Sequence, residues 1–156
     1  MIRVVGIGGP VGDDRAGLEA AARLAGNRPD GVEVILAERP GAGLLELFDP
    51  ADAVVLIDAV RSGACPGTLH DLELREVPAS SLRSLSSHGI GVAEALALGA
   101  ALGRLPARGR LIGVEAGLTP GGVGVSLSPA VEQALAAVIE RVCAWAHSFG
   151  SPVARW

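Results

Sequence analysis

Two aspartates and one histidine have the residue types and positions of a metal site. Asp14 follows a glycine-rich turn, Asp58 ends an apolar run, and His88 lies in a polar, glycine-flanked loop. Two carboxylates and one imidazole suit a divalent transition metal such as zinc, manganese, nickel or iron, and three ligands leave coordination positions open. Because no thiolate contributes, we expect weak resting affinity and a metal that arrives with the substrate.

The two aspartates also have an ordinary structural interpretation. Aspartates at a helix N-terminus are common caps, worth about 1 kcal/mol. One acid is enough for that role, which we assign to Asp13, so that Asp14 is free to point into the cleft. Asp58 could simply bind the loop at 59–63, but two independent caps would not need to face each other.

Histidines in loops are more often surface residues than ligands. His88 differs because its loop directly precedes a predicted helix on the expected ligand face. His70, within a predicted edge strand, and His147, near the end of the last helix, are interpreted as ordinary surface residues.

Strands alternate with helices along the chain. Continuous apolar runs bounded by glycine predict buried strands, and alanine- and leucine-rich segments with helical spacing predict helices. The predicted strands are 2–8, 32–37, 53–58, 68–74 (at an edge) and 110–115, and the predicted helices are 16–25, 42–48, 91–102 and 129–147. Residues 26–31 and 117–124 are predicted loops.

This order predicts one domain over residues 1–156, a three-layer α/β/α sandwich around a mostly parallel sheet with a mixed edge. Ligands of such sheets bind outside the carboxyl ends of the strands, where strand order reverses. In the commonest topology the first and third strands are neighbours at that point. Asp14 and Asp58 would then face each other across the crevice.

The glycines at 6–12 loosely resemble a dinucleotide-binding loop, with Glu38 at the end of the second strand. That loop works because bare helix N–H groups bind a pyrophosphate. Here Asp13 and Asp14 would repel phosphate at the helix start, Pro10 removes an N–H donor, and the glycine spacing differs by one. A nucleotide-binding domain is therefore the weaker alternative.

Composition narrows the class of protein. The net charge is −4 and all thirteen basic residues are arginine, with no basic stripe, which argues against nucleic-acid binding. No apolar run is long enough to span a membrane, and no signal peptide is evident. The two cysteines, Cys65 and Cys143, form no CxxC pair, so we expect a reducing cytoplasm.

Several motifs, taken in order, resemble the hydrogenase maturation proteases, which trim the C-terminal extension of a nickel–iron hydrogenase large subunit. The likeness covers nearly the whole chain. The motifs are VVGIG at 4–8, GDD at 12–14, LIDAV at 56–60, GTL at 67–69, SHGIG at 87–91, LIGVE at 111–115 and LSP at 127–129.

The resemblance implies a substrate, a metal and a reaction. The family's metal-contacting residues correspond to Asp14, Asp58 and His88, and the family recognises nickel already seated in the precursor before cutting the chain. Similar proteins usually carry asparagine at Gly9 and glycine at Arg15, and the loop before the acid pair is short here. These departures bear on substrate choice and leave the trio intact.

Two other functions remain open from the sequence. Cys65, in a flexible loop, could be a nucleophile with His88 as its base, although a neutral loop cysteine is the simpler interpretation. A non-catalytic, metal-sensing chaperone of a metalloenzyme precursor would use the same trio without cleavage. The leading expectation is an endopeptidase in which nickel polarises the scissile carbonyl or activates water.

Overall fold

The computed structural model describes residues 1–49, 51, 53–76, 91–117 and 126–150. Its elements are β1 (Ile2–Gly8), η1 (Gly12–Arg15), α1 (Ala16–Ala25), β2 (Val32–Glu38), η2 (Gly41–Phe48), β3 (Ala53–Val60), β4 (Leu69–Glu73), α3 (Val92–Ala101), β5 (Arg108–Glu115) and α4 (Pro129–Gly150). No helix in this part of the chain combines the length and hydropathy that crossing a bilayer requires.

The described strands form one sheet in the order β2-β1-β3-β5-β4. β1 pairs in parallel with both β2 and β3, and β3 pairs in parallel with β5. β4 alone among them is antiparallel and lies at the edge. The mostly parallel sheet with a mixed edge, predicted from the sequence, is confirmed, and β1 and β3 are neighbours as expected.

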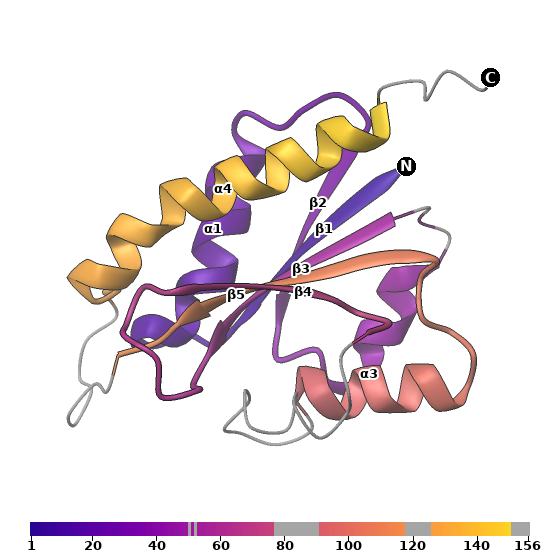
Figure 1. Cartoon of the computed structure of the whole chain (residues 1–156), viewed down its shortest axis with the longest axis horizontal. Helices are drawn as coiled ribbons and strands as arrows, with labels where there is room; N and C mark the ends of the chain where they lie inside the picture. Colours follow the sequence, from indigo (N-terminus) through magenta and orange to yellow (C-terminus); the bar gives the residue numbers. More distant parts are fainter. Residues whose placement is uncertain (50, 52, 77–90, 118–125, 151–156) are drawn as a thin grey trace.

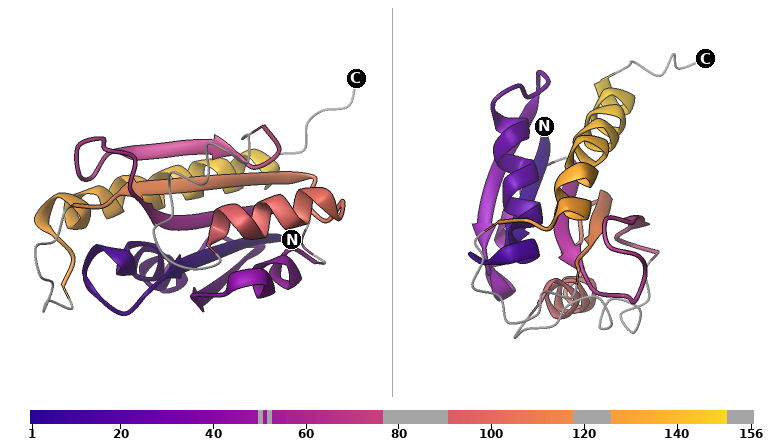
Figure 2. Two further views of the ribbon diagram at one scale, coloured as in Figure 1. Left: turned by 90° about the horizontal axis from the view of Figure 1, so that it is seen from below. Right: turned by 90° about the vertical axis from the view of Figure 1, so that its left-hand side faces the viewer.

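Helices cover both faces of this sheet (Figure 1). On one face α1 and α4 pack against inward residues such as Val4, Val55 and Val114. On the other, η2 and α3 pack against Val5, Leu56 and Leu111. Alternate residues of one strand enter opposite cores, which explains why the central strands are apolar throughout. Both views in Figure 2 show the same three layers.

Helix α1 forms because its alanines and leucine recur at helical spacing. Ala16, Ala20 and Leu24 lie on one face and are almost fully buried, whereas Glu19 and Arg23 pair with each other on the outside. The small buried residues bring the helix axis close to β1. This close approach sets the position of the turn that precedes the helix.

Seven elements differ from their predicted bounds by one to three residues, and one of them also differs in type. β3 continues two residues beyond Asp58 to Val60, because β5 offers pairing partners as far as Glu115. The segment 42–48 is a 3-10 helix beginning at Gly41, and α4 extends past His147 to Gly150. The extension of β3 to Val60 places Asp58 inside a paired strand instead of at its end.

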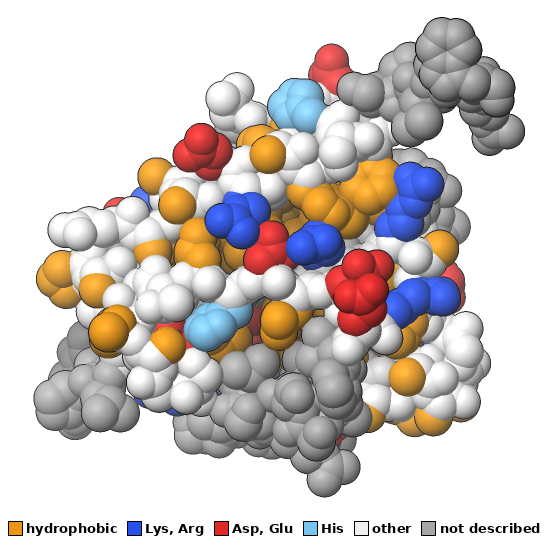
Figure 3. All heavy atoms as spheres, viewed as in Figure 1, with side chains coloured by type: hydrophobic (Ala, Val, Ile, Leu, Met, Phe, Trp, Pro, Cys, Tyr) orange, Lys and Arg blue, Asp and Glu red, His pale blue; other side chains and the backbone are white. Residues whose placement is uncertain are grey.

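The face carrying α4 and β4 has acidic and basic side chains interspersed (Figure 3). There Asp71 on β4 accepts hydrogen bonds from Arg110, at 2.6 Å, and from Arg141, at 3.1 Å. These bonds lower the pKa of Asp71 although its burial acts in the opposite sense. The contacts fasten the edge strand to β5 and to α4.

Candidate functional site

The glycines after β1 place Asp14 over the end of the sheet. A side chain at Gly8 would collide with the backbone carbonyl of Asp14, and one at Gly17 would collide with the carbonyls of Ile7 and Ile57. The Gly9 N–H donates to the Asp14 carbonyl at 3.0 Å. Because Gly8 and Gly17 have no Cβ atom, η1 and α1 can pack directly against the ends of β1 and β3. The Asp14 side chain is left 35% exposed at that edge.

The same contacts account for the glycines that resemble a nucleotide-binding loop. A phosphate loop needs backbone N–H groups that are not yet bonded. Here the Gly9 N–H is already used, and a 3-10 turn carrying Asp13 and Asp14 precedes α1. The glycines serve close packing, and the acids occupy the position that phosphate would need.

Asp13 does not cap the helix that follows it in the chain, so its predicted role was wrong. No side-chain cap bond forms at the start of η1 or of α1. Instead the buried Asp13 carboxylate accepts bonds from the Gly117 N–H at 2.9 Å, the Ser128 N–H at 2.6 Å and the Ser128 hydroxyl at 2.8 Å. It thereby ties the segment after β5 to the start of α4. Sequence separations above 100 residues hid this contact from local reasoning.

Asp58 lies beside Asp14 in a poorly solvated position. Strand alternation directs it to the same face as Val54 and Leu56, the face covered by η2 and α3. Burial, the largest cause, and the negative charge of Asp14 together raise the pKa of Asp58 to about 8, against the lowering effect of the hydrogen bond with the Ala59 backbone. Two acids therefore share one site, and the charge of one disfavours ionisation of the other.

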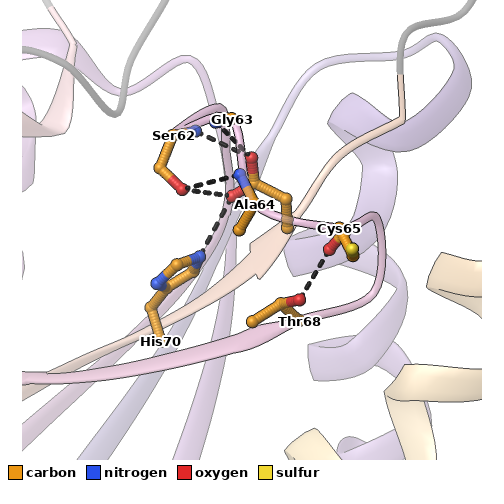
Figure 4. A network of polar contacts seen from close by, with 7 residues as sticks. Ser62, Gly63, Ala64, Cys65, Thr68 and His70 are labelled. Carbon is orange, nitrogen blue, oxygen red and sulfur yellow. Dashed lines mark hydrogen bonds and ion pairs between the residues drawn. The ribbon is translucent and has the colours of Figure 1, made fainter.

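A third carboxylate, that of Glu115, organises the loop after β3; Figure 4 labels its partners Ser62, Gly63 and His70. It accepts bonds from the Ser62 N–H at 2.8 Å, the Ser62 hydroxyl at 2.9 Å and the Gly63 N–H at 2.9 Å, and it contacts His70 Nε2 at 3.0 Å. Burial alone would raise the pKa of Glu115, but these partners outweigh it and lower the pKa. Contrary to the sequence interpretation, His70 is thus not an ordinary surface residue. It belongs to a partly exposed polar network around the buried Glu115 carboxylate.

Arg61 is the site residue that sequence reasoning missed. It follows Asp58 by three positions, and its guanidinium lies 3.5 Å from Asp14 Oδ1 and 3.4 Å from the Gly117 carbonyl. Its side chain is 35% exposed. The rule that ligand-facing residues follow the carboxyl ends of parallel strands would have included it.

Other residues considered from the sequence fall into two groups. His88 lies outside the described residues. Cys65 is exposed on the loop held by Glu115, and His147 is exposed on α4, where its Nδ1 lies 2.7 Å from the Cys143 carbonyl. Within the described ranges, no three His, Cys, Asp or Glu side chains come together as a metal-binding group. The structure therefore describes two of the three predicted ligands, Asp14 and Asp58.

Comparison with known proteins gives consistent matches. The family model "Hydrogenase maturation protease" matches residues 19–145. The hydrogenase expression/formation protein HupD of Thiocapsa roseopersicina is 32% identical over 96% of this chain and 69% of its own length. The hydrogenase 2 maturation protease of Escherichia coli is 35% identical over 72% of this chain and 73% of its own length. The solved hydrogenase maturating endopeptidase HybD of E. coli superposes with a TM-score of 0.79 at 27% identity, covering 96% of this chain and 93% of that one.

Proposed function

Because the chain belongs to the hydrogenase maturation protease family and is therefore a peptidase, we propose that it cleaves a nickel-loaded precursor. Its substrate is the large subunit of a nickel–iron hydrogenase, and the bond cut releases the C-terminal extension. The enzyme recognises the nickel through Asp14, Asp58 and His88. The metal is part of the substrate and is brought to the enzyme by the precursor.

The observation that carries this proposal is the pairing of Asp14 with Asp58. Neighbouring parallel strands bring both carboxylates to one edge of the sheet, and the charge of Asp14 contributes to the raised pKa of Asp58. Ionising both carboxylates at one site is costly, and a nickel ion with open positions bound between them would lower that cost.

The position of α3 supports a role for His88. Asp58 is directed to the sheet face that α3 covers, and α3 begins at Val92 with Gly91 as its N-cap. His88 is three residues before that cap in the sequence. His88 itself lies outside the described residues, and its contact with the nickel is part of the proposal.

The proposed chemistry divides between metal and protein. Asp14, Asp58 and His88 would hold the nickel of the precursor, which would supply Lewis-acid polarisation of the scissile carbonyl or of a water molecule, and one of the two aspartates would accept the proton that this water loses. The cytoplasm is the proposed compartment, since both described cysteines are free thiols, as a reducing environment requires.

The test is to process purified nickel-loaded precursor with single variants of the trio. Asp14→Asn, Asp58→Asn and His88→Ala should each abolish loss of the extension, followed by mass spectrometry, while circular dichroism shows a retained fold. Asp49→Asn is the matched control, because Asp49 is an exposed acid paired with Arg104 away from the trio. A trio variant that cleaves at the wild-type rate would remove that residue from the proposed site.

A further inference from the structure

Arg61 places a positive charge against the carboxylate that the proposed function assigns to nickel. Its loop is fixed by Glu115, which binds the next two residues, Ser62 and Gly63, through their backbone N–H groups. The guanidinium is thereby held between Asp14 and the Gly117 carbonyl. An arginine at this position already supplies Asp14 with a cation in the free protein.

The length and exposure of the Arg61–Asp14 contact indicate that another cation can displace the guanidinium. Charge-assisted bonds between arginine and carboxylate are usually about 2.7–2.9 Å long. Arg3–Glu33 and Arg110–Asp71 in this molecule reach 2.7 and 2.6 Å, whereas Arg61–Asp14 is 3.5 Å. Both side chains of the Arg61–Asp14 pair are about one-third exposed. Water and an incoming cation can therefore compete for the same carboxylate oxygen.

We propose that Arg61 is an internal counter-ion that suppresses binding of free metal ions at Asp14. The inference rests on the proposed function, because it takes Asp14 to be a nickel contact. A free divalent ion must displace the guanidinium and also meets its positive charge. A nickel ion held by the precursor binds together with the rest of the substrate. The free energy of the other substrate contacts compensates for displacing the Arg61 guanidinium. Arg61 is thus a specificity-determining residue that favours metal presented by protein.

A purely structural role makes a different prediction. If Arg61 only joined the loop after β3 to Gly117, its removal would loosen the site and weaken metal binding. If it is a counter-ion, neutralising it should tighten metal binding, and a lysine at the same position should preserve the wild-type affinity. The sign of the change therefore separates the two roles.

The experiment is isothermal titration of the purified protein with Ni²⁺ alone, without precursor. We expect Arg61→Gln to bind Ni²⁺ about five- to tenfold more tightly than wild type, equivalent to about 1 kcal/mol or slightly more. Arg61→Lys should stay within about twofold of wild type. Arg104→Gln is the control for net charge, since Arg104 is an exposed arginine paired with Asp49 elsewhere. It should leave the affinity unchanged.

A double-mutant cycle with Asp14→Asn separates this inference from the proposed function. Asp14→Asn should weaken Ni²⁺ binding, and adding Arg61→Gln to it should change the affinity by less than about twofold. If Asp14→Asn binds Ni²⁺ like wild type, the assignment of Asp14 fails and the counter-ion role fails with it. If Asp14→Asn weakens binding but Arg61→Gln does not tighten it, only the counter-ion role is overturned. An equal gain in Arg104→Gln would also overturn it.

Free Ni²⁺ in the processing assay gives an independent readout. Because Arg61→Gln would hold free ions at Asp14, added Ni²⁺ should inhibit its cleavage of loaded precursor at a several-fold lower concentration than for wild type. Equal sensitivity of the two proteins would contradict the role of Arg61 as a barrier to free metal.

Discussion

Replacing Asp58 by asparagine should stabilise the fold at neutral and alkaline pH. Burial and the charge of Asp14 raise the pKa of Asp58 from 3.8 to about 8. A carboxyl group whose pKa is raised on folding contributes most below its unfolded pKa, and that contribution disappears as the pH rises through the folded value. The wild type therefore loses stability relative to Asp58→Asn between about pH 4 and pH 8.

The size of the effect follows from the pKa. The difference between 3.8 and about 8 sets a ceiling of about 6 kcal/mol, because one pKa unit is worth about 1.4 kcal/mol. The Asp58 side chain is only half-buried by its accessible surface, so water reduces this cost. We expect the Asp58→Asn variant to be about 2–3 kcal/mol more stable than wild type at pH 8, and equal to it near pH 4.

Urea unfolding of both proteins at pH 4.5, 6, 7 and 8 measures this difference. Other acids, such as Glu115, titrate equally in both proteins and cancel in the comparison. At about 2–4 °C per kcal/mol for a chain of this size, the melting temperature at pH 8 should rise by several degrees. Asp14→Asn, which removes only the neighbouring charge, should give a smaller gain. A stability difference independent of pH, or a less stable Asp58→Asn at pH 8, would refute the reasoning.

Three further substitutions test other parts of the structure. Glu115→Gln should lower the free energy of unfolding at pH 7 by about 2 kcal/mol, because bonds to an ionised acceptor are lost; the deficit should shrink in acid as the wild-type carboxylate is protonated. Gly17→Ala should destabilise the fold by about 3 kcal/mol, since its Cβ meets the carbonyls of Ile7 and Ile57; a melting temperature like wild type would contradict this. Cys65→Ser should process precursor within about twofold of the wild-type rate. An inactive Cys65→Ser variant would instead support the mechanism in which the Cys65 thiol is the nucleophile.

The strands and helices were largely predictable because each has a strong local pattern. β1 and α1 have the predicted bounds, since an apolar run ending in glycine and an alanine-rich amphipathic segment leave little choice. β3 was predicted two residues short, because its extension depends on pairing with β5, which the sequence of β3 does not encode.

The site was predictable only where topology determines it. The parallel pairing of β1 with β3 brings Asp14, in the turn after β1, close to Asp58, near the carboxyl end of β3. The partners of Asp13, Glu115 and Arg61 are segments 45 to 115 residues away, so no local spacing signals them. Asp13 was misassigned for that reason, since a helix-start aspartate is normally explained by its own helix.

Cleavage of loaded and unloaded precursor by the same enzyme tests the central claim most directly. Nickel-loaded and nickel-free large-subunit precursors of identical sequence are incubated with the wild-type protein, and loss of the C-terminal extension is followed by mass spectrometry. If Asp14, Asp58 and His88 recognise nickel, the loaded precursor is cut and the nickel-free one is left intact. Equal cleavage of the two would contradict metal recognition and leave a protease that reads only the polypeptide.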